Sequence, residues 1–323
     1  MKTTGLSLIF LFLLVGCTTP LPKIHSDGHL IAGDFHISSE ISFQWRQRTT
    51  FLHIPPGLNS SDSHPLVIVL HGAFSTGEKT ALETGFNDLA DQEHFLVAYP
   101  EGIGLFGWLQ HWNAGHCCGK AADDKIDDIG FVMSVVDKLS RELPVDPSRI
   151  YLAGMSNGGM LAYRILAEQP ERFAAAAVVA GAISSRLPDV PEQKLPNTFQ
   201  GTPLVIFHGD ADQHIPPAGG TSPLGRGERS YSSLKDATEF WQRANGCSGE
   251  NDERTLREGG LRQVRVSCRQ DLEIWQLADW GHQWPGQHFT MRLSTDNPLY
   301  GFNATAEIWQ FFRRHVQPTG IQR

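Results

Sequence analysis

The sequence has no surplus of basic residues, since its 27 Lys and Arg stand against 35 Asp and Glu, a formal net charge of -8. Affinity for nucleic acid depends on a basic surface, so this balance argues against a nucleic-acid-binding protein. Internal repeats and low-complexity tracts are also missing. The chain does have 40% hydrophobic residues, including 18 Phe and 8 Trp, which is enough for a large core and argues against disorder.

The apolar run at the start, Leu6 to Gly16, is too short for the roughly 20 residues of a membrane span. After Lys2 it has the layout of an export signal. The run ends at Cys17 in a pattern that resembles a bacterial lipoprotein box, where the peptide is cut before the cysteine and the thiol is acylated. We predict a signal peptide over residues 1–16, lipidation of Cys17, a tether over 17–29, and outer-membrane retention because residue 18 is not Asp. The alternatives are an ordinary cleaved signal and an uncleaved anchor.

Cysteine is scarce, with five in 323 residues. An exported chain can keep disulfides, and the four cysteines beyond Cys17 allow three pairings. Cys247 and Cys268 bracket a short segment with the pattern of a loop and a strand, so we predict that pair. The adjacent Cys117 and Cys118 would then form a vicinal disulfide or stay reduced. Zinc held by these two with nearby histidines is disfavoured, because adjacent cysteines cannot easily wrap one ion.

Beyond the tether, apolar runs alternate with segments of helical pattern, which predicts one α/β domain over residues 30–323. The run at 65–70 is continuously apolar, as in a strand buried on both faces of a parallel sheet. Residues 41–54 have the pattern of one or two antiparallel edge strands. The other predicted strands are 95–99, 150–153, 174–180, 204–207 and 272–277, and the predicted helices are 79–92, 127–143, 156–168, 234–244 and 303–315.

The sharpest motif is Gly154-Met155-Ser156-Asn157-Gly158, directly after a predicted strand and directly before a predicted helix. In a nucleophile elbow, a serine occupies a strained strand-to-helix turn whose neighbours must be small so that strand and helix can approach. The pattern therefore predicts a nucleophile at Ser156.

A serine hydroxyl needs a base to take its proton and an acid to orient that base, and in this arrangement both follow it in the chain. The loop after strand 204–207 offers Asp210 and Asp212, and we predict Asp212, because Asp210 directly follows a glycine and is better placed to shape the turn. The loop after the last strand offers His282, which follows a glycine, with His288 as the alternative.

An oxyanion hole needs two backbone N–H groups. We predict that one belongs to Asn157 and the other to Ala73, on the loop after strand 65–70, with Phe74 as the neighbouring possibility. The aromatic residues closest to the motifs are candidates for lining an acyl or aryl pocket, although core packing is an equal alternative for each. They are Phe74, Trp112 and Trp284.

Taken in order, the segments LHGAF, W..HCCG followed by DDIGF, GMSNGG, HGDAD, GHQWPG and ATAEIWQFFRRH resemble the polyhydroxybutyrate depolymerase and feruloyl esterase family of α/β hydrolases. The resemblance covers roughly residues 51–315. It implies the α/β-hydrolase fold, with a mostly parallel sheet covered by helices on both faces, and hydrolysis of acyl esters by Ser156, Asp212 and His282. Family members often have a small or hydroxyl residue where Asp210 stands, so a second carboxylate could perturb the acid.

The expected function is a serine esterase that acts on feruloyl, acetyl or hydroxyalkanoate esters, small or polymeric, through an acyl-enzyme. No metal or organic cofactor is needed for that chemistry. Two alternatives stay open: a serine peptidase of the same fold, and a non-catalytic envelope protein that binds a ligand on a hydrolase scaffold. The sequence indicates attachment to a membrane only through the lipid on Cys17, and it does not indicate an oligomeric state.

Overall fold

The computed structural model describes residue 25 and residues 27–43, 46–105, 108–187, 193–195, 201–224, 228–257 and 260–317. The predicted signal peptide and the lipidation site at Cys17 lie outside the described residues, as does most of the tether. In the part of the chain that the structure describes, no helix combines the length and the apolar character needed to cross a membrane.

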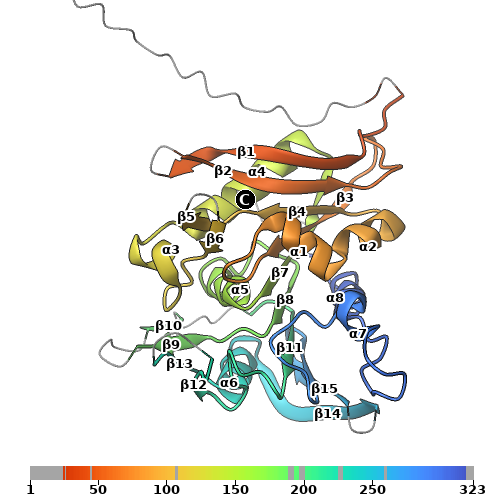
Figure 1. Cartoon of the computed structure of the whole chain (residues 1–323). Helices are drawn as coiled ribbons and strands as arrows, with labels where there is room; N and C mark the ends of the chain where they lie inside the picture. Colours follow the sequence, from red (N-terminus) through yellow and green to blue (C-terminus); the bar gives the residue numbers. More distant parts are fainter. Residues whose placement is uncertain are drawn as a thin grey trace, which may run out of the picture.

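A ten-stranded sheet forms the centre of the molecule, with the strand order β1-β2-β4-β3-β7-β8-β11-β16-β15-β14 (Figure 1). The strands from β4 to β16 pair in parallel, and antiparallel strands extend the sheet at both edges. The bounds are β1 Gly33–Phe43, β2 Arg46–Ile54, β3 His64–Leu70, β4 Leu96–Pro100, β7 Val145–Met155, β8 Ala175–Val179, β11 Leu204–Gly209, β14 Cys247–Arg257, β15 Leu261–Cys268 and β16 Leu272–Leu277.

Helices cover both faces of this sheet because its central strands carry apolar side chains on both faces. Successive side chains of a strand point to opposite faces. In β3, Leu66, Ile68 and Leu70 join the core cluster that contains residues of α4, α5 and α6, whereas Val67 and Val69 join the cluster that contains residues of α1, α2 and α8. These helices span Gly77–Thr84 (α1), Phe86–Glu93 (α2), Asp128–Glu142 (α4), Asn157–Glu168 (α5), Leu234–Ala244 (α6) and Ala304–Phe312 (α8). The predicted mostly parallel sheet with helices on both faces is confirmed.

The structure corrects the prediction in two places. The helix predicted over 79–92 is two helices, because Gly85 adopts the left-handed conformation at φ 68° and both ends α1 and begins α2. Between Cys247 and Cys268 there are two paired strands, β14 and β15, where we predicted a loop and a strand. That hairpin extends the sheet at its edge.

Several short elements had no prediction and lie in the connections between sheet strands. They are the hairpin β5 Ile103–Leu105 and β6 Trp108–His111, helix α3 Gly119–Asp123, helix α7 Gln287–Thr290, and a small sheet of β9 Ser184–Arg186, β10 Gln193–Lys194, β12 Gly220–Thr221 and β13 Ser230–Tyr231. Pieces of two to five residues are too short to show a hydrophobic period in the sequence.

Candidate active site

Ser156 lies in a sharp turn between β7 and α5. Its backbone has φ 53° and ψ -120°, a positive φ that is rare for a residue with a Cβ. The turn is possible because its neighbours are glycines: a Cβ on Gly154 would collide with the backbone of Gly158, and a Cβ on Gly158 would collide with the carbonyl groups of Leu70 and His71. The motif thus brings the start of α5 against the end of β3, and the half-buried Ser156 stays accessible.

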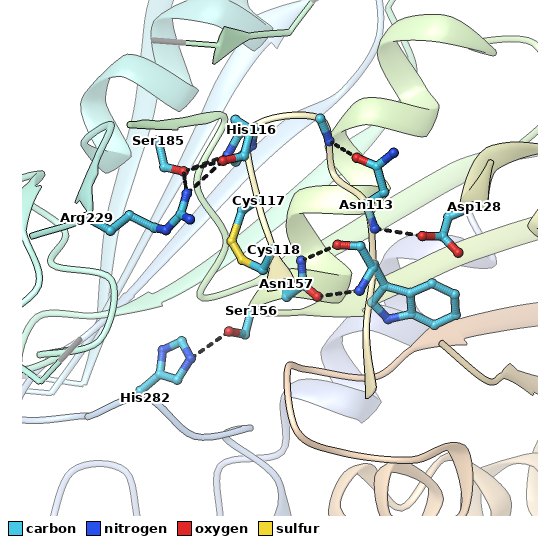
Figure 2. The surroundings of a disulfide bond; sticks show 12 residues. Asn113, His116, Cys117, Cys118, Asp128, Ser156, Asn157, Ser185, Arg229 and His282 are labelled. Carbon is cyan, nitrogen blue, oxygen red and sulfur yellow. Dashed lines mark hydrogen bonds between the residues drawn. A yellow bond between two sulfur atoms is a disulfide. The ribbon is translucent and has the colours of Figure 1, made fainter. Parts of the chain in front are cut away.

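Three residues that are distant in the sequence meet at this turn. The Nε2 atom of His282 lies 2.8 Å from Ser156 Oγ, and its Nδ1 atom lies 2.7 Å from Asp212 Oδ2. Figure 2 shows the imidazole of His282 facing the serine. His282 comes from the loop after β16 and Asp212 from the loop after β11, and these strands are parallel neighbours, so both loops leave the same edge of the sheet. The structure therefore brings together the three residues predicted as nucleophile, acid and base.

The Asp212 carboxylate is buried and fixed on both oxygens. Its Oδ1 atom accepts the backbone N–H groups of His214 (2.8 Å) and Ile215 (2.9 Å), which leaves Oδ2 for His282. Burial raises the pKa of this carboxyl, but the hydrogen bond and charge of His282 and the backbone N–H of Ile215 outweigh burial, so the pKa is lowered overall. Asp212 thus stays ionised where it faces the imidazole.

Asp210, the alternative acid, points elsewhere. Its Oδ1 atom accepts the backbone N–H of Asp279 at 2.7 Å, and so it holds the loop after β11 to the loop after β16. Next to Asp210, the backbones of the two loops approach so closely that a Cβ on Gly209 would collide with the carbonyl group of Trp280. His288, the alternative base, lies in α7, and its ring contacts the side chain of Arg292, just after that helix.

Two further histidines, His208 and His214, lie beside the acid and the base, and no motif in the sequence indicates a role for them. His208 is buried, hydrogen-bonds through Nε2 to the Ile215 carbonyl (2.8 Å) and lies 3.5 Å from Asp212 Oδ2. The ring of the exposed His214 lies 5.0 Å from that of His282. Only their position two residues before Asp210 and two after Asp212 could have drawn attention to them.

The loop after β3 approaches Ser156 from the other side. A Cβ built on Gly72 would lie 3.5 Å from Ser156 Cβ. This loop offers the N–H groups of Ala73 and Phe74 as oxyanion donors, but that of Phe74 already donates to the Gln110 carbonyl at 2.8 Å. Ala73 is therefore the better placed of the two for an oxyanion hole, together with the N–H of Asn157 at the start of α5.

Two of the three aromatic residues predicted to line a substrate pocket are in the core, and for them the prediction is wrong. Trp112 is 0% exposed and its Nε1 donates to the His71 carbonyl, while Trp284 is 1% exposed and donates to Thr305 Oγ1. An indole with an apolar body and one donor is readily buried when that donor finds a partner. Phe74 is 63% exposed, with its ring edge against His111, and it remains a candidate.

Both cysteine pairs are disulfides in the structure: Cys247 with Cys268, across β14 and β15, and Cys117 with its neighbour Cys118. Figure 2 shows the vicinal pair between Ser156 on one side and His116 with Ser185 and Arg229 on the other. Within the described residues, no group of three or more His, Cys, Asp or Glu side chains is placed to hold a metal ion.

The buried His71 and His116 are held neutral. Burial lowers the pKa of His71 to about 4 and that of His116 to about 3, in the second case aided by the positive charges of Arg229 and Arg164. In His71, Nδ1 donates to the Gly72 carbonyl (2.7 Å) and Nε2 accepts the Gly102 N–H (2.9 Å). A proton added to Nε2 would therefore face the N–H of Gly102.

We therefore expect acid to destabilise the fold through His71. An unfolded histidine titrates near 6.5. Between that pH and about 4, the unfolded state binds a proton that the folded state does not, so the free energy of unfolding falls as the pH is lowered, by about 3 kcal/mol for this group. Urea unfolding from pH 7.5 to 4 measures this loss. His71→Gln should be less stable at pH 7.5 yet lose less on acidification, whereas His288→Gln, an exposed control, should follow wild type. Equal acid losses in all three proteins would contradict the assignment.

The chain shares sequence and fold with known esterases. The family model described as Esterase PHB depolymerase matches residues 49–187. NocK of Nocardia uniformis subsp. tsuyamanensis, which carries the name of an esterase, is 31% identical over 277 residues, which cover 78% of this chain and 75% of NocK. Feruloyl esterase B of Piromyces equi is 28% identical over 70% of this chain, but the match spans only 40% of that protein.

A solved structure shows the same fold at low sequence identity. The acetyl xylan esterase of Aspergillus awamori superposes with a TM-score of 0.52 and 16% identity over 73% of this chain and 89% of that one. The predicted α/β-hydrolase fold is thereby confirmed. Since the similarity to NocK extends over more than two thirds of both chains, this chain belongs to the Esterase PHB depolymerase family of α/β hydrolases.

Proposed function

We propose that the protein is a serine esterase that hydrolyses carboxylic esters through an acyl-enzyme on Ser156. The observation that carries this proposal is the continuous contact from Asp212 through His282 to Ser156, at 2.7 and 2.8 Å. A base within about 3.2 Å of a hydroxyl can take its proton as that hydroxyl attacks.

In the first step, Ser156 Oγ attacks the ester carbonyl carbon while its proton moves to His282 Nε2. The carbonyl oxygen becomes an oxyanion, which the N–H groups of Ala73 and Asn157 stabilise. The protonated imidazole, held and stabilised by Asp212, then gives its proton to the leaving alcohol as the ester C–O bond breaks. Water repeats the sequence on the acyl-enzyme, with His282 as base, and releases the acid.

The acyl group belongs to one of three classes. The family description names polyhydroxybutyrate, and the relatives are named for feruloyl and acetylxylan esters. We propose that this enzyme takes small or polymeric esters within these classes. The exposed Phe74, on the loop that carries Ala73, is our candidate for contact with the acyl or aryl group.

The test is a comparison of esters on purified protein without residues 1–17. The panel consists of p-nitrophenyl acetate, butyrate and octanoate, methyl ferulate and a hydroxybutyrate oligomer. We expect turnover, with the order of kcat/KM values identifying the acyl class, and labelling by a fluorophosphonate whose added mass maps to the peptide of Ser156. Folded protein that hydrolyses none of these esters and takes no label would reject the esterase. Cleavage of peptides instead would favour a peptidase, and binding without cleavage a ligand-binding protein.

We also propose that the chain is an exported lipoprotein anchored through Cys17. The support is the sequence alone, a short apolar run that ends in Gly16-Cys17. Expressed as the full chain in a bacterium with an outer membrane and fed an alkyne fatty acid, wild type should take up the label and sediment with outer membranes. Cys17→Ser should lose both properties, and Cys247→Ser should keep the label. A labelled Cys17→Ser protein, or wild type free in the periplasm, would refute the anchor.

A further inference from the structure

We propose that Trp112 is a positioning residue that joins the two halves of the oxyanion hole. This inference rests on the proposed esterase mechanism, in which the N–H of Asn157 and the N–H of Ala73 stabilise one oxyanion. The two donors come from separate segments, the start of α5 and the loop after β3, and Trp112 is hydrogen-bonded to both segments.

On the side of α5, the bonds come from the Asn157 side chain. Its Oδ1 atom accepts the Trp112 backbone N–H at 2.7 Å, and its Nδ2 atom donates to the Trp112 carbonyl at 3.1 Å. Figure 2 shows two dashed bonds at the Asn157 side chain, next to Ser156. Asn157 is 1% exposed, so a buried side-chain amide is satisfied on both atoms by the backbone of one residue. The residue that would supply one oxyanion donor is thus fixed to Trp112.

On the side of the loop after β3, the bond comes from the indole. Trp112 Nε1 donates to the His71 carbonyl at 2.9 Å, and the two rings lie 4.7 Å apart. His71 precedes Gly72 and Ala73, and its ring is held by the Gly72 carbonyl and the Gly102 N–H. The segment that would supply the second donor is therefore fixed to the same tryptophan.

Trp112 itself has little freedom to move. It is fully buried, and its carbonyl also accepts the N–H of Cys118 at 3.0 Å. The next residue, Asn113, donates its N–H to Asp128 Oδ2 at 2.6 Å. Asp128 in turn forms a buried ion pair with Arg48 at 2.7 Å, and the Arg48 guanidinium lies 5.6 Å from the centre of the indole ring. A residue held this firmly can transmit position from one segment to the other.

The distance between two oxyanion donors matters because both must lie about 2.7–3.1 Å from one oxygen. Removal of one such donor lowers kcat by about 100- to 1000-fold in a well-studied protease. A small displacement should have a smaller effect of the same kind. Loss of the bridge should therefore weaken stabilisation of the oxyanion without changing how the uncharged substrate binds.

Trp112→Phe tests this bridge, since it keeps an aromatic ring and the backbone bonds to Asn157 but removes the donor to His71. With p-nitrophenyl acetate we expect kcat to fall about 10- to 50-fold while KM stays within about threefold. An alkyl trifluoromethyl ketone provides an independent measurement. Ser156 adds to its carbonyl carbon, the serine proton passes to His282, and the ketone oxygen becomes an oxyanion in the hole. Its Ki should rise by about the same factor as kcat/KM falls.

Trp309→Phe is the matched control. Trp309 is also buried and donates through Nε1, to Glu93 at 3.0 Å, but it belongs to α8. We expect it to lower the melting temperature while kcat and Ki remain at the wild-type values. Equal losses of activity in the two variants, or no loss in Trp112→Phe, would overturn the inference. If wild type itself neither turns over esters nor binds the ketone, the proposed function fails first, and that result is recognisable before any variant is made.

A second variant breaks the bridge at its other end and keeps the test valid if Trp112→Phe does not fold. Asn157→Ala leaves the backbone N–H in place but removes both bonds to Trp112, so it should show the same pattern of lowered kcat, raised Ki and steady KM. Two breaks in one bridge should cost little more than one, so the double variant should fall well short of the product of the single effects. Multiplicative losses would mean that the two contacts act separately, which contradicts a single bridge.

Discussion

Ser156→Ala is expected to lower kcat for ester hydrolysis by about a millionfold, to the level of residual catalysis by the rest of the site. Without Oγ there is no atom to form the acyl-enzyme, and His282 loses the hydroxyl that it contacts at 2.8 Å. Binding should survive, because the oxyanion loop and the surrounding surface are unchanged. Steady-state kinetics on the fastest ester, with KM or substrate affinity measured in parallel, gives the result.

A measurement of stability distinguishes loss of the nucleophile from a folding defect. Ser156 holds a strained backbone with φ 53°, and alanine is no better suited to that conformation than serine, so the melting temperature should change little. Ser148→Ala removes a hydroxyl that donates to Asp146 Oδ1, and it should retain full activity. Appreciable turnover by folded Ser156→Ala would reject this serine as the nucleophile, and a covalent fluorophosphonate adduct on that variant would show which residue is attacked instead.

The sequence permits prediction of the site wherever a chemical requirement fixes both residue type and place in the fold. Gly154 and Gly158 are required for a turn in which backbones nearly touch, and this requirement makes the elbow at Ser156 predictable from the sequence. Asp212 and His282 follow from the rule that functional loops leave the carboxyl ends of parallel strands. The central sheet is predictable for a similar reason, because strands buried on both faces are apolar throughout.

Features that depend on tertiary contact were not predictable in this way. Trp112 and Trp284 lie close to motifs in the sequence, yet both point into the core, and proximity along the chain does not tell which way a ring turns. The break at Gly85 depends on one left-handed residue within an otherwise helical pattern. The hairpin of β14 and β15 at the sheet edge carries many polar residues, so the sequence shows no clear alternation that would predict two paired strands there.

Asp212→Asn should lower kcat by about ten-thousandfold, although it changes one oxygen to an NH2 group. Two backbone N–H groups, from His214 and Ile215, point at Oδ1, so the amide oxygen of the new side chain must take that position. Its NH2 group then faces His282 Nδ1 and donates to it. The imidazole is forced to carry its proton on Nε2, the atom that should accept the proton of Ser156. The variant thus has the right geometry with the wrong tautomer, and it also lacks the negative charge that stabilises the imidazolium.

Asp210→Asn is the control that makes this argument specific to Asp212. Asp210 accepts the N–H of Asp279, and an amide oxygen can accept the same bond, so kcat should stay within about threefold of wild type. The two variants carry the same substitution two residues apart on one loop, and kcat measured for both on one ester decides between the two acids. A large loss in Asp210→Asn with a small loss in Asp212→Asn would reverse the assignment. Large losses in both would show that the site also needs the negative charge of Asp210, since the bond to Asp279 is kept in the variant.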